Sequence, residues 1–426
     1  MNSAESVMSQ SVGKRQLQFQ WLEFRAMLAG NVLVSVVDGD LHVDGDEHGN
    51  VLKLQQLSAS DARAAGGGAS FRITPDADTS INRNDPGAEI VVSGITDDIL
   101  IDLGDGNDEV ALQGANGRRL RDLVIDAGNG PDAVTITRFN LSGDVRVSAA
   151  NAINVSVQQS TAAGISVAAD NSDRSTIGAS DVSSSAVTIR NSNLLRGVSV
   201  SSGGPLAVKT KRVTIFPPPV DVCKVPAPPA PFVPCGTVNI SGGGMLTADI
   251  NQTIASDVVV KIKSNRDEFK AGAEPLSSSV TIRKSRFRQN IDLSSDVPLS
   301  VNIRQTWVQG EVVIKASGSP STSGVRNSDP ANTIRVVDSV FGSLNVIGSE
   351  SRDQLCLLRL RVLGESSVQA GGGDDSLEVV DSLFNGLAFF DGGNDTDTLS
   401  VLRTRFRNGN KTVNWEVTDS SIPEKR

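Results

Sequence analysis

The chain has 426 residues, of which only 4% are aromatic and none is tyrosine, and it carries a formal net charge of -9 with a pI near 5.0. This charge argues against a general nucleic-acid binder, since such proteins are basic. No apolar run in the sequence is long enough to span a membrane as a helix.

The segment 31–98 precedes the repeats described below and contains several short alternating stretches. Val32–Val37 and Leu41–Val43 flank Asp38-Gly-Asp40, which is the pattern of a hairpin. Further strands are predicted at Val51–Leu54, Phe71–Ile73 and Glu89–Val92. We predict that this segment is a small β-meander that caps the array, because the exposed ends of a solenoid need protection.

Self-similarity dominates residues 99–415. The four segments that begin at Val134, Val187, Val280 and Val301 are apolar at the start and again two, seven, eleven and thirteen residues later. Three further copies, beginning at Ile334, Leu377 and Leu399, have one gap shorter by a residue, and resolved neighbours start 19 to 24 residues apart. Two period-2 strands joined by a bend cannot close a core alone, so they need neighbours above and below. We therefore predict an all-β, right-handed parallel β-helix.

Two other fold classes fit the pattern less well. Long helices do not fit, because the apolar spacing follows period 2 rather than 3.6. A β-sandwich is the stronger rival, but its strands occupy unlike environments and do not require matching repeats. The sixth position of each copy is hydroxylic in six of seven cases, which suits a turn where the hydroxyl bonds neighbouring backbone: Ser192, Ser285, Thr306, Ser339, Ser382 and Thr404.

Four of the repeat strands follow a turn of the form G-x-G-x-D-x-apolar. The turns are Gly104–Val110, Gly128–Val134, Gly371–Leu377 and, with Asp in place of the second Gly, Gly393–Leu399. They resemble the nonapeptide repeats of haemolysin-type calcium-binding proteins, in which glycines open the turn and carbonyl and Asp oxygens ligate calcium. Copies here lie 24 and 22 residues apart instead of nine, which leaves a calcium half-site between adjacent coils. The predicted ligands are Asp105, Asn107, Asp108, Asn129, Asp132, Asp374, Asp375, Asn394, Asp395 and Asp397.

Charge supports a ligand role for these acids. Stacked coils would place Asp108 about 4.8 Å from Asp132, and like carboxylates at that spacing repel unless a cation or a raised pKa relieves them. The equivalent positions of the middle coils are Ser185, Ser278, Leu299 and Asn332, so the turn itself does not require the acid. The alternative is that Asp, Asn and Gly are simply good turn formers on a solvated corner.

A second resemblance covers most of the chain in order. Leu22–Val32, followed by Gly39–Gly45 and Ile99–Asp108, looks like the repeat-rich extracellular proteins of planctomycete-type bacteria. The resemblance implies export and an extracellular or cell-surface location, with residues 1–30 as a leader that includes the processing segment Leu22–Gly30. It carries no activity with it.

A Pro-rich insertion at 216–235 interrupts the repeats and is bracketed by Cys223 and Cys235. A disulfide between them would close a loop worth roughly 3 kcal/mol in an oxidising compartment, and whether it forms is left open. The insertion fits both a recognition loop and a tolerated excursion. The third cysteine, Cys356, is predicted to be a buried small hydrophobe, and residues 416–426 are a C-terminal tail.

The sequence favours a non-enzymatic function. Its only histidines, His42 and His48, lie in the predicted cap, and no Ser-His-Asp or Cys-His arrangement can be assembled. We therefore expect a secreted or cell-surface structural or adhesive solenoid, stabilised by calcium at the Asp/Gly turns. The alternative is a glycan-binding or polysaccharide-degrading, lyase-like β-helix, in which an Arg or Lys base would act beside calcium carboxylates.

Basic residues define the candidate binding surface. Arg190, Arg283 and Arg304 recur at one position of the coil. Arginines also flank two inward phenylalanines, so alternation places them outside, where a solvated face is the simpler explanation: Arg286, Arg288, Arg405 and Arg407. The partners this surface would suit are acidic polysaccharides or other surface proteins, with no nucleic acid.

Overall fold

The computed structural model describes residues 30–58, 68–115, 119–170, 184–215, 236–243, 245–263, 277–317 and 332–421. In these ranges the chain forms β-strands and no α-helix, arranged in two long sheets of 22 and 16 strands. The same ranges therefore contain no helix that could cross a membrane. The predicted leader, apart from Gly30, and the Pro-rich insertion with Cys223 and Cys235 lie outside the described residues.

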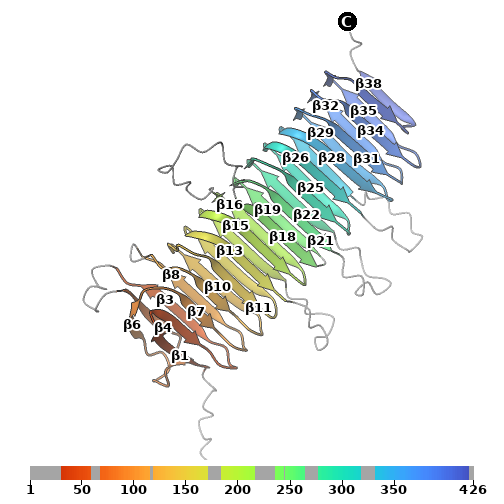
Figure 1. The fold of residues 1–426 in the computed structure, drawn as a ribbon. Helices are drawn as coiled ribbons and strands as arrows, with labels where there is room; N and C mark the ends of the chain where they lie inside the picture. Colours follow the sequence, from red (N-terminus) through yellow and green to blue (C-terminus); the bar gives the residue numbers. More distant parts are fainter. Residues whose placement is uncertain are drawn as a thin grey trace, which may run out of the picture.

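The strands stack along one long axis in chain order, which gives the molecule the shape of a rod (Figure 1). The 16-stranded sheet contains β3 (Val51–Gln56), β4 (Ala69–Pro75), β6 (Ile90–Ile95), β8 (Glu109–Gln113), β10 (Asp132–Thr137), β12 (Ile153–Gln158), β14 (Ser185–Arg190), β16 (Leu206–Lys211), β19 (Leu246–Asn251), β22 (Ser278–Arg283), β25 (Leu299–Arg304), β27 (Asn332–Val337), β29 (Asp353–Leu358), β32 (Ser376–Val380), β35 (Thr398–Leu402) and β38 (Val417–Ser421).

The larger sheet forms the rest of each coil. It contains β1 (Gly30–Val37), β2 (Asp40–Asp44), β5 (Thr79–Ile81), β7 (Ile99–Asp102), β9 (Leu123–Asp126), β11 (Val145–Ala149), β13 (Thr161–Ala169), β15 (Asn193–Ser202), β17 (Thr214–Ile215), β18 (Thr237–Gly243), β20 (Ile254–Ala255), β21 (Val258–Lys263), β23 (Arg286–Phe287), β24 (Ile291–Ser295), β26 (Trp307–Ala316), β28 (Val340–Ser349), β30 (Arg361–Val362), β31 (Ser366–Gly371), β33 (Leu383–Phe384), β34 (Ala388–Gly393), β36 (Arg405–Phe406) and β37 (Asn410–Val413).

One coil shows how the repeat is built. Strand β22 of the smaller sheet ends at Arg283, and Lys284 turns the chain with a positive φ of 51°. The two-residue strand β23 follows, and β24 then completes the coil in the larger sheet. Each strand pairs in parallel with its counterpart in the next coil, as β22 does with β25. The predicted all-β stack of coils, with neighbours in parallel register, is confirmed.

Antiparallel pairing is confined to the N-terminal end among the described strands. Strands β1 and β2 form the predicted hairpin, with Val36 opposite Leu41. Strand β4 pairs antiparallel with both β3 and β6. From β7 and β8 onward every described pairing is parallel, so the change in pairing falls close to the boundary predicted at residue 98.

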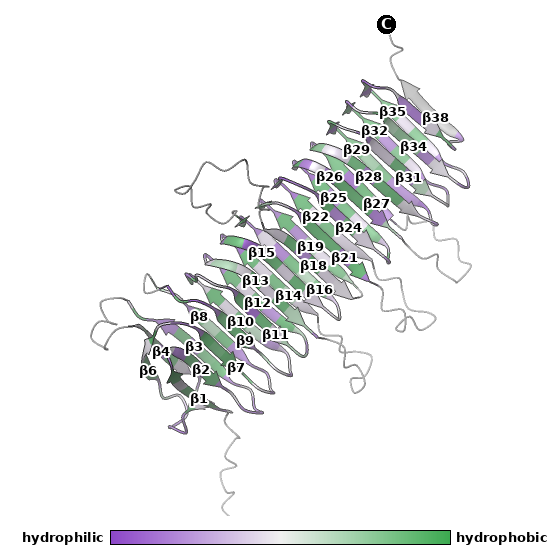
Figure 2. Ribbon diagram, in the orientation of Figure 1, coloured by the Kyte–Doolittle hydropathy of each residue, from purple (hydrophilic) through white to green (hydrophobic). Residues whose placement is uncertain are grey.

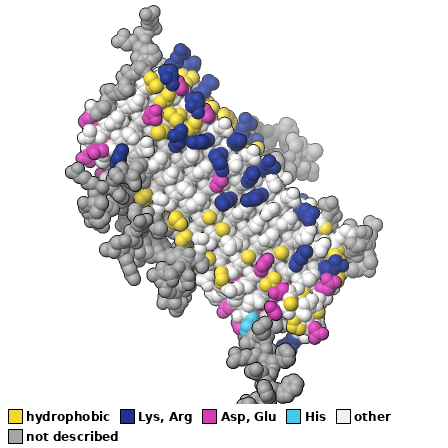
Figure 3. Space-filling view, turned by 180° about the vertical axis from the view of Figure 1, so that it is seen from behind, with side chains coloured by type: hydrophobic (Ala, Val, Ile, Leu, Met, Phe, Trp, Pro, Cys, Tyr) yellow, Lys and Arg dark blue, Asp and Glu magenta, His cyan; other side chains and the backbone are white. Residues whose placement is uncertain are grey.

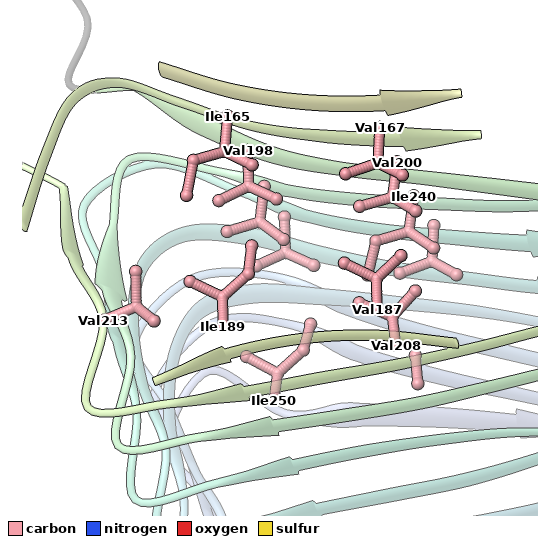
Figure 4. Close-up of a cluster of buried hydrophobic side chains, with 14 of the residues drawn as sticks. Ile165, Val167, Val187, Ile189, Val198, Val200, Val208, Val213, Ile240 and Ile250 are labelled. Carbon is pink, nitrogen blue, oxygen red and sulfur yellow. The ribbon is translucent and has the colours of Figure 1, made fainter. Parts of the chain in front are cut away.

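Alternation along the strands fills the space between the two sheets with aliphatic side chains. Ile165 and Val198 of the larger sheet face Ile189 and Ile250 of the smaller one, and Val213 closes the bend between them (Figure 4). The hydropathy colouring shows the same alternation on strand after strand (Figure 2). Burial of this apolar surface, at about 25 cal/mol per Å², is the main force that holds the coils together.

The predicted hydroxyl column lies at the bend and is buried. Ser285 is representative: its hydroxyl donates to the carbonyl of Arg283 at 2.8 Å and accepts the backbone N–H of Thr253, in the preceding coil, at 3.2 Å. Ser192 and Ser339 make the same pair of contacts. The side chain therefore replaces a backbone partner that the left-handed bend residue leaves unavailable.

One prediction about the core was wrong. Cys356 is not fully buried: it lies half-buried on the outer face of β29, between Arg335 and Glu378 of the neighbouring strands. Its Sγ is 3.7 Å from Glu378 Oε2. Leu355 and Leu357 point inward, and strict alternation then turns the residue between them outward, a constraint that the apolar run around it concealed.

Candidate functional site

The Asp/Gly turns form one corner of the coil, and their central acids point into the molecule. Asp108, Asp132, Asp375 and Asp397 are each at most 2% exposed. One carboxylate oxygen of each accepts a backbone N–H from the preceding coil; Asp132 Oδ1, for example, lies 3.0 Å from Asp108 N. The other oxygen of each, Oδ2, is buried and has no hydrogen-bond partner among the described residues.

This contact is the local form of a rule that holds along the column. Where the next coil supplies a polar residue, its side chain accepts the corner N–H, as Ser278 does for Leu246 and Asn332 does for Leu299. Where the next residue is apolar, as at Leu299, the carbonyl just before it takes over, so Ser278 N donates to Pro298 O. The register confirms that Ser185, Ser278, Leu299 and Asn332 occupy the position of the acids.

Burial sets the protonation of the acids. Desolvation raises the pKa of Asp108 to about 7 and that of Asp132 to about 6, against the lowering effect of their backbone hydrogen bonds. In the second group desolvation raises the pKa of Asp375 to about 8, with a further contribution from the neighbouring Asp353. Desolvation also raises the pKa of Asp353 and of Asp397. Near neutral pH Asp375, and Asp108 in part, therefore hold a proton unless a cation replaces it.

The remaining predicted ligands lie on the outside of the same corner. Asp105 Oδ1 accepts from Asn129 Nδ2 at 2.7 Å, and Asp395 Oδ2 accepts the backbone N–H of Gly373 at 3.0 Å. Asp374 Oδ1 accepts the N–H of Thr396, while Asn107 and Asn394 are exposed. The ten predicted ligands are thus divided between an inner and an outer row, because alternate residues of the turn face opposite ways.

The glycines of the motif have a structural role of their own. Gly128 has a φ of +67°, and a Cβ built on it would lie 1.7 Å from the carbonyl oxygen of Gly104 in the preceding coil. The same contact recurs at Gly393, 1.8 Å from the carbonyl oxygen of Gly371. Close stacking of the turns therefore requires glycine whether or not a metal is bound.

A different acidic cluster has the compact geometry of a metal site. Ligand atoms of Asp40, Asp97 and Asp98 lie within 4.8 Å of one another, and they are the one such group in the part of the chain that the structure describes. Arg121 already pairs with two of these acids, with Nη1 3.1 Å from Asp97 and Nε 2.9 Å from Asp98. The guanidinium lowers the pKa of Asp98 against the opposing effect of burial. We assign this cluster to structural ion pairing.

The predicted basic residues come together along one edge of the rod. Strand register places Arg190, Lys211, Asn251, Arg283 and Arg304 in one column across five successive coils. Figure 3 shows Lys and Arg side chains gathered in a band along the molecule. Only Arg283 of this column has an ion-pair partner among the described residues, Asp249 at 2.8 Å. Arg190 and Lys211 thus lie in neighbouring coils, about 4.8 Å apart along the stack, and Arg304 lies three coils beyond Lys211 in the same column.

The column of bend residues, with φ near +50°, lies beside this edge and widens it. It includes Arg212, Gln252, Lys284 and Gln305 in the same coils. The next position outward holds Ile254, Arg286 and Trp307, and further along Arg361 and Arg405. Arg288 and Arg407, like Arg286 and Arg405, are exposed as alternation predicts. We give the name basic edge to Arg190, Lys211, Arg212, Lys284, Arg286 and Arg304.

Sequence reasoning missed Lys211, Arg212 and Trp307. In the coil that carries Lys211 and Arg212, the Pro-rich insertion at 216–235 follows Ile215 and hides the repeat spacing. Trp307 lies within a recognised repeat, but its position in that repeat has no distinctive sequence signal. The spacing of Leu206, Val208 and Val213 could have revealed the first two. No family model, no curated protein and no solved structure matches this chain.

Proposed function

We propose that the protein is a non-enzymatic scaffold, located outside the cell or on its surface, that holds an acidic polysaccharide along the basic edge. The observation that carries this proposal is the shared register of Arg190, Lys211 and Arg304, three cations in one column of the rod without an ion-pair partner among the described residues. Several cations in one column suit a polymer that carries repeated anionic groups. The leader implied by the resemblance supports the location.

Binding without turnover suits the chemistry of the edge. Its charged groups are Arg and Lys, which stay protonated near neutral pH and hold anions well but exchange protons poorly. We also propose that the coils form a right-handed β-helix, because about 98% of parallel crossover connections within one sheet are right-handed. A capping role for strands β1 to β6, whose antiparallel pairs cover the first parallel coil, belongs to the same proposal.

We expect the protein to be retained on immobilised polygalacturonate or dextran sulfate and released by salt, because exposed ion pairs are screened. The variant Arg190→Glu/Lys211→Glu/Arg304→Glu should bind at least about tenfold more weakly, with each lost charge contributing up to about 1 kcal/mol. The control Lys53→Glu/Lys261→Glu/Lys263→Glu makes the same change of charge away from the edge and should bind nearly as well as the parent. Equal loss in both variants, or shortening of the polymer during incubation, would refute the proposal.

We also propose calcium as a stabilising ion at the two Asp/Gly segments. The unpartnered Oδ2 atoms of Asp108, Asp132, Asp375 and Asp397 support it, because a buried oxygen without a donor is relieved by a proton or a cation. These carboxylates, with the exposed Asp105, Asp374 and Asp395, are hard oxygen ligands of the kind calcium takes.

At pH 8.5 millimolar calcium should raise the melting temperature of the parent by several degrees, since an ion that binds only the folded state stabilises it. The variant with Asn at the four buried positions should respond much less. Magnesium serves as the control, because it dehydrates reluctantly and demands a stricter geometry. Equal shifts in parent and variant would place any calcium effect elsewhere.

A further inference from the structure

A shallow groove crosses the basic edge at its middle. Its volume is about 500 Å³. It spans four successive coils, from the bend after β16 to the bend after β25 and the start of β26, and is lined by Arg212, Gln252, Ile254, Lys284, Ser285, Arg286, Gln305 and Trp307. Two of these are exposed amides and three are exposed cations, so the lining can hold both hydroxyl and anionic groups.

Two of the cations are oriented in advance. The guanidinium of Arg286 lies over the ring of Trp307, 5.1 Å from its centroid, which is the geometry of a cation–π contact. Arg212 Nε donates to Oε1 of Gln252, a residue of the next coil, at 3.2 Å, and this hydrogen bond orients the Arg212 guanidinium. Lys284 lies in the same coil as Arg286 and has no ion-pair partner in the described ranges. Because these side chains are already oriented, less side-chain entropy is lost when a ligand binds.

The aromatic ring is the second element of the groove. Trp307 is half-buried, and the side chain of Ile254, in a nearby coil of the same column, is 44% exposed. Strand register places Arg286 between these two side chains, so the groove has apolar groups in the coils on both sides of that guanidinium. A flat apolar surface bordered by cations and amides fits a sugar ring, whose C–H face is apolar and whose rim carries hydroxyl and acidic groups.

We propose that this groove is the subsite that positions one acidic sugar unit of the bound polymer, with its carboxylate or sulfate held by Arg212, Lys284 and Arg286 and its ring placed against Trp307. The proposal rests on the proposed function, because the rest of the edge would hold the polymer on either side. A nucleic acid is disfavoured, since the groove offers a single aromatic ring where stacking of successive bases needs several.

The test uses a short acidic oligosaccharide, trigalacturonate, which is too small to bridge the whole edge. Its titration should change the tryptophan emission of the parent saturably, and the same titration of Trp307→Phe should not. Arg286→Gln and Lys284→Gln should weaken the response at least about tenfold, whereas Lys261→Gln, on β21 and outside the groove lining, should leave it intact. A sulfated trisaccharide of similar length shows which acidic group is preferred, and an uncharged trisaccharide should give no change.

The outcomes separate the subsite from the general function. No emission change with any acidic oligosaccharide, or an equal change in the Trp307→Phe variant, would refute the subsite. Retention of the parent on the polymer column would still support the basic edge in that case. Tighter binding of single-stranded oligonucleotides than of acidic oligosaccharides would overturn the choice of ligand class.

Discussion

In the presence of a chelator, the protein is expected to melt at a lower temperature at pH 8.5 than at pH 5. The buried acids are the reason: burial raises the pKa of Asp108 to about 7, of Asp132 to about 6 and of Asp375 to about 8, well above the value in an unfolded chain. Between pH 4 and pH 8 the folded state therefore holds more protons than the unfolded state, so the free energy of unfolding falls as the pH rises.

The expected effect is large because a tenfold change in the acid dissociation constant of one carboxyl group corresponds to about 1.4 kcal/mol. A loss of several kcal/mol should lower the melting temperature by on the order of 5 °C or more. The guanidinium groups of Arg359 and Arg403 lower the pKa values of Asp338 and Asp381. These two acids therefore change the free energy of unfolding only below about pH 4. Circular dichroism melts at pH 5 and pH 8.5 measure the effect.

The control variant is suggested by the chain itself. Asn332 occupies the same column, and its Oδ1 accepts the N–H of Leu299 at 2.9 Å, so an amide fits there. Replacement of Asp108, Asp132, Asp375 and Asp397 by Asn should flatten the pH dependence and raise the melting temperature at pH 8.5. An unchanged slope in this variant would show that other groups control the titration.

Gly130→Ala is expected to destabilise the protein by on the order of 3 kcal/mol or more, through backbone strain and a clash between coils. Gly130 has a φ of +133°, and a Cβ on it would lie 1.5 Å from the carbonyl oxygen of Gly106. Backbone atoms cannot move away as a flexible side chain could, so the stack must open at this corner.

Gly94→Ala separates the two causes. Gly94 also has a positive φ, +91°, but no atom of the described residues lies within 4 Å of its Cβ position. This variant should lose only the cost of the backbone conformation, roughly 1–2 kcal/mol. Chemical denaturation of both variants gives the difference, and equal losses would mean that the stacking of the turns does not depend on glycine.

The fold was predictable where the sequence repeats without interruption. Val280 and Val301 start neighbouring copies, and they are directly paired in the structure. The coils of β12 and β16 were missed for different reasons: small residues such as Ala162 replace the bulky inward side chain in the first, and a long insertion separates the second from its continuation. A search for repeated bulky apolar residues cannot reveal a coil in which a small residue lies inside and neighbouring coils fill the space.

The residues of the candidate sites could be predicted from the sequence, but which way their side chains face could not. The sequence identified the acids of the turns, yet it did not show that Asp108 faces inward and Asp105 outward, because that depends on where alternation resumes after the turn. The column of Arg190, Arg283 and Arg304 was visible, whereas the groove around Trp307 needed the placement of three neighbouring columns. Columns follow from spacing along the chain, but surfaces follow from how coils lie side by side.

The corner hydrogen bonds give the rod a direction of assembly. The N–H of Asp353 is bonded by Asp375, and that of Asp375 by Asp397, while Ser278 N is bonded by the carbonyl of Pro298. At these corners the acceptor, whether side chain or carbonyl, comes later in the chain. A growing or emerging chain therefore always ends in one unfinished corner, which the next coil closes as it arrives. Such a chain can fold progressively behind a narrow exit, with the same small deficit at its advancing end however many coils have already formed.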